Sequence, residues 1–371
     1  MAVDEWVGIV QTTIPKFMKG ASNLTKRKRL FLAMLNKKGR YEYNQSGTEC
    51  RWQVKFRQPQ MQSYNGSGAI DFTNTDAYRQ LVMQWRGYYL QDSINYKQQL
   101  MNSRTQALVN LAGEKISNLT ESARDNLNGE LFKSGETSGR QDCLHGLETF
   151  LTAGTTVVAD VAGKPAGTYG GYSCAVGAEG GAWSALMSTK PNASIGYDWP
   201  LGQGDSDYDW NSPKLCNWSS SGFGTSSNAW SANCWRALMR LQSWLNLTGG
   251  PDGECDLCPM GSNLWEGFVE FLETKQRELV PHKEATDLGF GNTLNMNGMA
   301  IYPEFDCPSD TFYELNCSKI TISCMTPELL WMKGPTEDIR SGGSKLFLVG
   351  MFGNVKYVPK FVGKGYPYAA S

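Results

Sequence analysis

The clearest pattern of hydrophobic and polar positions is the strict alternation along residues 50–57, Cys-Arg-Trp-Gln-Val-Lys-Phe-Arg. A period of two predicts a strand that buries one face. Turn-forming residues flank it at 44–47 (Asn-Gln-Ser-Gly) and at 64–68 (Tyr-Asn-Gly-Ser-Gly). The pattern therefore predicts a projecting β-hairpin over residues 39–75. Because an isolated hairpin is marginally stable in water, we expect a partner to cover its apolar face.

A long strand and a long helix are predicted to follow the hairpin. The strand runs from Tyr78 to Tyr96, and its apolar positions change phase at Gly87, which indicates a β-bulge. Residues 97–133 then show helical spacing, and a helix of that length would span on the order of 50 Å. Its single apolar stripe consists of Leu100, Leu108, Leu111, Ile116, Leu119, Ala123, Leu127 and Leu131. Such a length indicates a structural spine rather than an ordinary domain helix.

The remaining segments predict a mixed α+β chain. Residues 1–38 predict an N-terminal arm with a short helix, for which Thr25 is a candidate N-cap. The glycine- and aromatic-rich segment 152–230 has little periodicity and predicts packed, irregular loops. Further helices are predicted at 231–247 and 262–279, and short strands at 319–324, 346–349 and 355–358.

Composition describes a foldable globular chain without a strong electrostatic field. The 371 residues are 40% hydrophobic and 19% charged, with a formal net charge of -1. A global attraction to nucleic acid is therefore not expected. There is no run of about 18 apolar residues and no basic, apolar leader at Met1–Trp6. We therefore expect synthesis in the cytoplasm, and the ten cysteines are interpreted as free buried thiols, with disulfides as the alternative.

Catalytic chemistry has few candidates. The chain has two histidines, His145 and His282, and it lacks the common zinc-protease, phosphate-loop, nucleophile-elbow and dinucleotide motifs. Cys255 and Cys258 form a single C-x-x-C without a second pair, so packing is favoured over zinc or redox chemistry. Cys143 precedes His145 closely, but a turn is the favoured interpretation. We therefore expect no enzyme activity, no cofactor and no metal.

Two features of segment 152–230 leave alternatives open. The carboxylates of Asp205, Asp207 and Asp209 are candidates for a hard cation, or for a solvated or arginine-paired loop. The tryptophans and tyrosines at 169–235 are candidates for stacking on sugars or partner surfaces, or for the core of the segment itself.

The order of these parts resembles the major capsid protein of tailed bacteriophages, the Hong Kong 97-like fold. An arm, a hairpin extension, a bent strand and a spine helix are followed by a turn at 134–147 that resembles the family's step into its axial domain. Shorter similarities cover nearly the whole chain. They lie at 180–183 (Gly-Gly-Ala-Trp), 208–213 (Tyr-Asp-Trp-Asn-Ser-Pro), 275–277 (Lys-Gln-Arg), 288–290 (Leu-Gly-Phe) and 298–302 (Gly-Met-Ala-Ile-Tyr).

This resemblance implies a virion shell protein that forms pentamers and hexamers around packaged double-stranded DNA, which it contacts without sequence specificity. It implies a portal, a possible decoration protein and no membrane. Because only 38 residues precede the hairpin, a separate scaffolding protein is expected. The implied organisation is an arm at 1–38, an extended hairpin loop at 39–77, a peripheral domain at 78–145 and 284–371, and an axial domain at 146–283.

The residues expected to carry function are contacts between subunits. On the hairpin they are either the apolar face or the polar face of the strand, and on the arm they are a basic run. The hairpin candidates are Trp52, Val54 and Phe56 on one face and Arg51, Lys55 and Arg57 on the other. The arm candidates are Lys26, Arg27, Lys28 and Arg29.

Two rival functions remain at this stage. An encapsulin-like nanocompartment would use the same fold to hold cargo enzymes. A carbohydrate-binding β-rich protein would use the aromatic centre of the chain, but the spine helix and the absent secretion signal argue against it.

Overall fold

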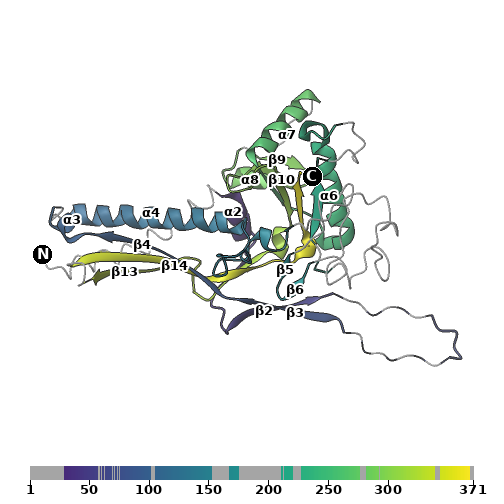
Figure 1. Cartoon of the computed structure of the whole chain (residues 1–371), viewed down its shortest axis with the longest axis horizontal. Coiled ribbons are helices and arrows are strands. Elements are labelled where there is room, and N and C mark those ends of the chain that lie inside the picture. The colour runs from purple at the N-terminus through teal and green to yellow at the C-terminus, as the bar shows by residue number, and fades with distance from the viewer. Residues whose placement is uncertain are drawn as a thin grey trace.

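A long rod, a broad body and a projecting hairpin make up the molecule (Figure 1). Helix α4 and strands β4, β13 and β14 form the rod, while helices α6 and α7 stand on the body. The computed structural model describes residues 29–56, 59, 61, 63–68, 70, 72, 74, 76–101, 105–152, 167–174, 210–211, 213–219, 227–275, 281–291, 293–338 and 343–367.

The predicted spine helix is confirmed in its central and C-terminal parts. It consists of α3 (Tyr96–Met101) and α4 (Thr105–Leu131), and the 27 residues of α4 span about 40 Å. Leu100 is 60% exposed, so the apolar stripe does not extend over α3. The buried stripe on α4 includes Ile116, Leu119, Ala123, Leu127 and Leu131.

A five-stranded sheet forms the second layer of the rod, against α4. Its centre is β14 (Ser344–Lys356), which pairs with β4 (Arg86–Ile94) on one side. On the other side β14 pairs with β13 (Trp331–Asp338) and then with β12 (Thr321–Cys324), and β1 (Tyr41–Glu42) adds to β12. The two strands predicted near 346–358 are therefore one continuous strand that ends at Lys356.

Strand β13 lies at an edge of this sheet and is interrupted. Its register with β14 shifts between Lys333 and Thr336, and Pro335, which lies between them, has no backbone N–H to donate. The edge of the rod therefore offers a broken row of hydrogen-bonding groups.

The bend that separates the hairpin from the rod lies at Trp85. Strand β3 (Tyr78–Gln84) pairs with the hairpin strand β2 (Glu49–Lys55), whereas β4 begins at Arg86 and pairs with β14. The predicted β-bulge at Gly87 is wrong, because β4 pairs with β14 in unbroken register through that residue. The single strand predicted from Tyr78 to Tyr96 is instead two strands of different sheets that meet at Trp85. Gly87 serves a close contact, because a Cβ there would lie 2.6 Å from the ring of Phe352.

The body is built on a six-stranded sheet covered on one face by α6 (Trp230–Gly249) and α7 (Ser262–Thr274). Both helices match the predicted segments. The strands in order are β7 (Lys214–Asn217), β15 (Val362–Tyr366), β11 (Phe312–Leu315), β8 (Leu257–Met260), β10 (Met299–Pro303) and β9 (Leu294–Met296). A short helix α8 (Lys283–Asp287) precedes β9.

This sheet differs from the expected domain division. We assigned residues 284–371 to the part that contains the spine helix, yet β9, β10, β11 and β15 join the same sheet as β7 and β8. The chain therefore crosses from body to rod and back once after residue 290, between β11 and β12 and between β14 and β15.

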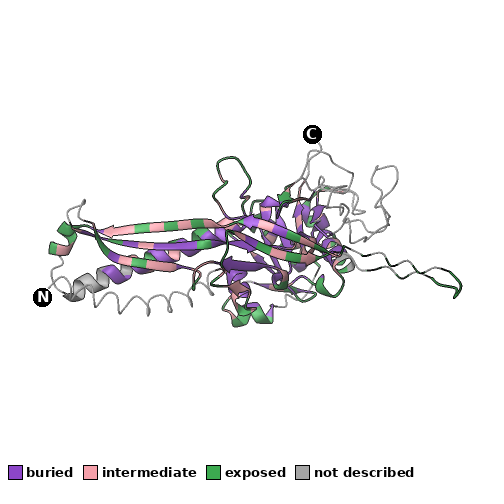
Figure 2. Ribbon diagram, turned by 90° about the horizontal axis from the view of Figure 1, so that it is seen from below, coloured by how far each residue is buried: buried purple, intermediate pink, exposed green. Residues whose placement is uncertain are grey.

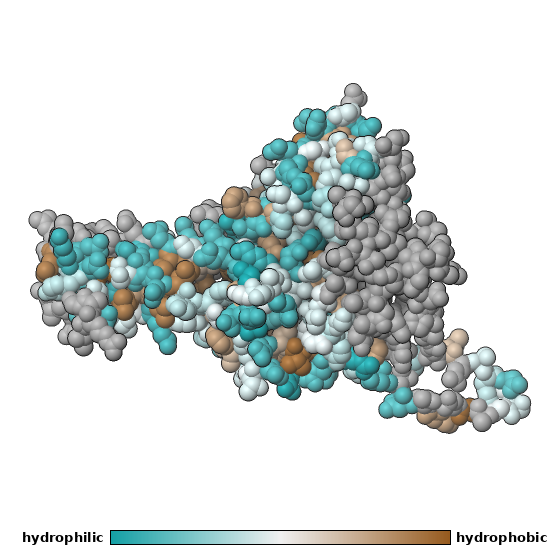
Figure 3. Space-filling model, viewed as in Figure 1, coloured by the Kyte–Doolittle hydropathy of each residue, from teal (hydrophilic) through white to brown (hydrophobic). Residues whose placement is uncertain are grey.

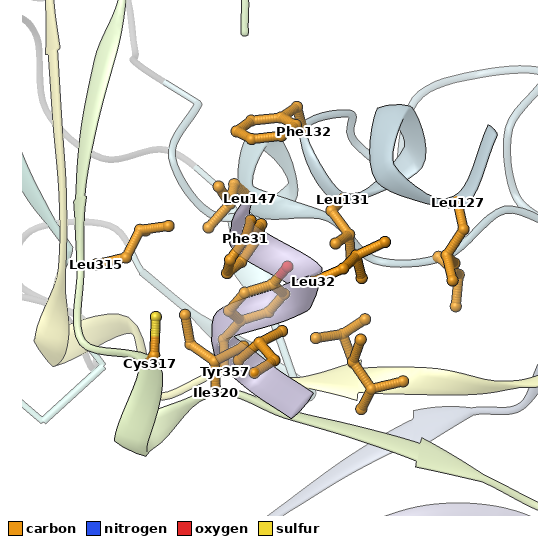
Figure 4. Close-up of a cluster of buried hydrophobic side chains, with 14 of the residues drawn as sticks. Phe31, Leu32, Leu127, Leu131, Phe132, Leu147, Leu315, Cys317, Ile320 and Tyr357 are labelled. Carbon is orange, nitrogen blue, oxygen red and sulfur yellow. The ribbon is translucent and has the colours of Figure 1, made fainter. Parts of the chain in front are cut away.

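Residues 30–37, which were predicted to belong to the N-terminal arm, form a core helix instead. Helix α2 (Leu30–Lys37) has six consecutive buried residues at its start. Figure 4 shows Phe31 and Leu32 among Leu131, Phe132 and Tyr357, in the cluster that joins rod and body. Because such a helix is apolar on all sides, it belongs inside the molecule.

The ten cysteines are free thiols, as expected. Nine are buried, including Cys255 and Cys258 of the C-x-x-C, and burial raises the pKa of Cys50 to about 11. Thiols held in this protonated form are poor nucleophiles and poor metal ligands. Among the described helices, none has the length and apolar character needed to cross a membrane.

Candidate assembly interface

The hairpin base is a two-stranded ribbon with two different faces. Strands β2 and β3 pair in antiparallel register, with Trp52 opposite Leu81 and Lys55 opposite Tyr78. Burial alternates along β2 as the sequence predicts. One face therefore points toward the body, and the other faces solvent.

The apolar face of the ribbon is covered by the chain's own body. The ring of Trp52 lies 6.0 Å from that of Tyr169, and the ring of Phe56 lies 6.1 Å from that of Trp210. Phe56 is 7% exposed, and Val54 packs against the same core. The expectation that a partner must cover Trp52, Val54 and Phe56 is wrong for the described structure, because residues distant in sequence supply that cover.

A small hairpin beneath the ribbon supplies the cover. It consists of β5 (Thr168–Tyr169) and β6 (Tyr172–Ser173), joined by a tight turn at Gly170 and Gly171. The hydroxyl of Tyr169 donates a 2.8 Å hydrogen bond to the Val355 carbonyl oxygen and accepts one from the Tyr357 amide. The turn is thus anchored to the end of β14.

The polar face of the ribbon remains open to solvent. Arg51 and Lys55 are exposed, and Arg51 pairs with Glu49 at 2.8 Å. Of the two faces that the sequence left open, this one is accessible to another molecule. Arg57, the third predicted residue, lies outside the described residues.

The hairpin tip carries exposed apolar side chains that the sequence reasoning missed. Met61 is fully exposed, and Phe72 is 90% exposed. Tyr64 and Ile70 are each more than half exposed. Figure 1 shows this segment far from the body, and Figure 3 shows brown apolar atoms near its end. The available signal was the recurrence of large apolar residues within a turn-rich segment, where polar residues are usual.

Arg29, predicted as an arm contact, is instead engaged within the chain. Its guanidinium lies 3.3 Å from Asp125 of α4, 3.6 Å from Glu304 and 3.9 Å from Asp306. The Asn128 amide donates to Glu304 and Asp306 at 3.3 and 2.6 Å. Burial raises the pKa of Glu304, and the positive charge of Arg29 opposes that rise. Arg29 thus compensates an acidic cluster at the base of the spine, while Lys26, Arg27 and Lys28 lie outside the described residues.

A second exposed apolar surface lies on the sheet of the rod. Tyr89 is 70% exposed and Phe352 is 43% exposed, and Leu346 is also exposed. The Trp331 ring packs directly on Gly350, because a Cβ at that position would lie 2.5 Å from a ring atom. In Figure 2, exposed and intermediate residues recur along these long strands. That these side chains share one face was not predictable from local pattern, because it depends on the pairing of β4 with β14.

The candidate chemical groups serve structural contacts where the structure describes them. His145 is buried, its pKa is lowered by that burial, and it contacts Asn354 at 2.9 Å. His282 caps α8 by accepting from the Ala285 amide. Within the described residues no group of histidine, cysteine or carboxylate side chains is arranged to hold a metal ion. The predicted cation loop at Asp205, Asp207 and Asp209 lies outside them.

The aromatic residues of the centre are mostly core where the structure describes them. Trp218 stacks edge-on against Trp230 at 5.3 Å, and both are 8% exposed. Trp210 and Trp244 are each 3% exposed. These rings are therefore unavailable to stack on sugars, which weakens the carbohydrate-binding alternative for the described part of the segment. Trp183, Trp199 and Tyr208 lie outside the described residues.

Comparison with known proteins gives a likeness in structure only. No protein-family model and no curated protein matches the sequence. The capsid asymmetric unit of cyanophage A-1(L) aligns with 12% identity and a TM-score of 0.55, covering 88% of this chain and 90% of that one. The capsid of an empty GTA particle aligns with 12% identity and a TM-score of 0.53, covering 89% of each chain.

The likeness extends over nearly the whole chain and includes the native GTA particle, with a TM-score of 0.52. It shows that the chain has an α+β, Hong Kong 97-like capsid fold. The fold expected from the order of sequence elements is therefore confirmed.

Proposed function

We propose that this chain is the major capsid protein of a tailed bacteriophage and that it assembles into the icosahedral shell that encloses double-stranded DNA. Its role is structural rather than enzymatic, and its location is the virion. The observation that carries the proposal is the capsid fold over nearly 90% of the chain together with a hairpin tip whose described apolar side chains are exposed.

The exposed tip supports assembly for an energetic reason. Burying apolar surface is worth about 25 cal/mol per Å², so side chains such as Phe72 and Met61 gain stability when another copy covers them. The open polar face with Arg51 and Lys55 adds charges that orient a partner. In this proposal the tip and the polar face contact a neighbouring subunit, while the apolar face of the base holds the hairpin to its own body.

The sheet of the rod is the proposed receiving surface for the tip. Tyr89 and Phe352 expose aromatic rings there, and aromatic residues are enriched at protein interfaces. The main proposed partners are further copies of this chain, which form pentamers and hexamers. A scaffolding protein, a portal, a possible decoration protein and packaged DNA are proposed as further partners from the same fold analogy.

Electron microscopy of the purified, concentrated chain, preceded by light scattering, tests the proposal. Closed round shells, or rings of five and six subunits, are the expected result. Shells that co-purify with an enzyme, without portal or scaffold, would favour a cargo compartment instead. A strict monomer across salt and protein concentrations, even when candidate scaffolding protein is added, would contradict assembly.

A pair of tip variants distinguishes a lost contact between subunits from a loss of folding stability. Phe72→Ser removes an exposed apolar ring and should reduce shell yield without lowering the unfolding midpoint, because the ring has no packing to lose. Phe72→Leu keeps an apolar side chain and should assemble nearly as well as the wild type. Equal yields from both variants would remove the tip from the proposed interface.

A further inference from the structure

Three Asn-Gly dipeptides occur in the chain, at 65–66, 128–129 and 297–298. The sequence alone does not distinguish them, yet the structure places them in three different environments. The side-chain amide of such an asparagine can be attacked by the next backbone nitrogen, because glycine has no Cβ to hinder the approach. Whether the attack occurs depends on whether the amide carbon and the attacking nitrogen are free to meet.

At 128–129 both reacting groups are held. Asn128 is fully buried within α4, and its amide nitrogen donates to Asp306 at 2.6 Å and to Glu304 at 3.3 Å. Gly129 lies inside the helix, where its N–H belongs to the helical hydrogen-bond ladder. The rigid helical backbone keeps the nitrogen away from the side-chain carbon.

At 297–298 the residues are exposed, but their polar groups are engaged. The dipeptide forms the tight turn between β9 and β10 with φ of 51° and 86°. The amide nitrogen of Asn297 donates to Gln242 at 3.0 Å, and the Gly298 N–H donates to Asn295 at 3.0 Å. The nucleophile is thus occupied and the side chain is turned away to α6.

At 65–66 the two reacting groups are not engaged. Both residues are exposed at the hairpin tip, and in the described structure neither the Gly66 N–H nor the amide nitrogen of Asn65 makes a hydrogen bond. The side-chain oxygen of Asn65 accepts from the Ser67 amide at 3.2 Å and from the Ser67 hydroxyl at 3.3 Å. In this Asx-turn the amide nitrogen of Asn65, which is the leaving group, stays exposed to water. Two donors from Ser67 lie at the side-chain oxygen, on which negative charge develops during the attack.

We propose that Asn65 is a site of spontaneous covalent modification in the folded protein, whereas the other two Asn-Gly pairs are protected by the fold. The deprotonated nitrogen of Gly66 forms a bond to Cγ of Asn65, and the negative charge on the side-chain oxygen is held by the two Ser67 donors. Collapse of this intermediate breaks the bond to the amide nitrogen, which takes a proton and leaves as ammonia. The product is a five-membered succinimide.

Water then opens the ring at one of its two carbonyls. One product is aspartate and the other is isoaspartate, in which the backbone runs through the Cβ and is longer by one methylene. Either product adds a negative charge to the tip. Such a charge would be costly to bury against a neighbouring copy. This last consequence rests on the proposed function, whereas the modification itself does not.

The test is peptide mass spectrometry of the full chain incubated in mildly alkaline buffer, with fragmentation that distinguishes aspartate from isoaspartate. We expect conversion at Asn65 to exceed conversion at Asn128 and Asn297 by at least about tenfold. The same incubation in concentrated urea should bring the three rates together, because the fold alone separates them. Equal native rates at the three sites, or slower conversion at Asn65, would overturn the proposal.

Two variants check the assigned roles. Gly66→Ala adds a Cβ next to the nucleophile and should slow conversion strongly. Ser67→Ala removes the hydroxyl donor but keeps the backbone donor, so a reduction of a few-fold is expected. Undiminished conversion in Gly66→Ala would contradict attack by this nitrogen. These readouts do not depend on shell formation, so failure here is distinguishable from failure of the capsid proposal.

Discussion

The backbone amide of Val82 donates a 3.1 Å hydrogen bond to the carbonyl oxygen of Gly170, and this bond joins the hairpin to the small turn beneath it. Gly170 adopts a positive φ of 62° and lies against Leu81, whose Cδ2 would be 2.6 Å from any Cβ at that position. A glycine in a distant segment therefore helps to hold the base of the hairpin against the body.

Replacing Gly170 should loosen the hairpin from the body. Gly170→Ala combines strain at positive φ with overlap against Leu81, and we expect a loss of about 2–4 kcal/mol in the free energy of unfolding. Gly171→Ala is the matched control, since its φ of 88° is also positive but no atom lies within 4 Å of its Cβ. It should cost about 1 kcal/mol. Urea unfolding followed by tryptophan fluorescence compares the two, and equal losses would argue against the Leu81 contact.

Removing the positive charge from the acidic cluster should destabilise the base of the spine. Arg29→Gln leaves Glu304, whose side chain is 4% exposed, without its cation, and we expect a loss of about 3 kcal/mol at neutral pH. A second substitution, Glu304→Gln, should restore much of that loss. A double variant as unstable as Arg29→Gln alone would show that Arg29 acts through packing.

The same cluster predicts a direction for pH dependence. Burial raises the pKa of Glu304 above its ordinary value of 4.5, so the folded chain holds this proton more tightly than the unfolded chain. The contribution of Glu304 to stability therefore falls as pH rises above 4.5. Loss of Arg29 raises this pKa further. The stability difference between Arg29→Gln and the wild type should grow toward neutral pH and shrink in acid, as measured by urea midpoints.

Reversing the charge of the hairpin's polar face should block assembly without unfolding the subunit. Arg51 and Lys55 are exposed, so Arg51→Glu with Lys55→Glu should shift the unfolding free energy by less than about 1 kcal/mol. Shell yield, counted by electron microscopy, should fall sharply. The control pair Arg51→Lys with Lys55→Arg keeps the charges and should assemble. Normal shells from the reversed double variant would refute a role for this face.

A buried carboxyl in the body should limit stability at neutral pH. Glu314 on β11 is fully buried, and neither of its oxygens has a hydrogen-bond partner in the described structure. Burial therefore raises its pKa well above 4.5, and its stability cost grows as pH rises past that value. Glu314→Met should raise the free energy of unfolding at pH 7 by about 1–3 kcal/mol and flatten its pH dependence. A lower midpoint in the variant would show that the carboxyl has an unseen partner.

The elements that local pattern determines were predictable. The stripe on α4 and the helices α6 and α7 follow from apolar spacing, since each helix buries one side against a sheet. The order of these elements was enough to predict the capsid fold. In contrast, α2 was assigned to the N-terminal arm, since the basic run that precedes it is visible in the sequence. Its burial depends on residues far along the chain, such as Ile320 and Tyr357.

The candidate interface was only partly predictable for the same reason. Alternation along β2 gave the two faces of the ribbon correctly. It did not reveal that Tyr169 and Trp210 cover the apolar face, because those contacts bridge more than a hundred residues of sequence. The partners of Arg29 likewise come from two separate segments, α4 and the loop at 304–306. Long-range pairing, rather than local propensity, decided which predicted residues face solvent.

The interrupted edge strand β13 limits how copies of this molecule can join. Its register shift and Pro335 deny a second chain the continuous ladder that cross-β stacking needs. Sheet-to-sheet growth along the rod would be open-ended, since nothing would stop a further copy from adding. At this edge, copies that meet are left with side-chain contacts, which can close upon themselves and stop. The broken edge therefore favours particles of finite size over fibres.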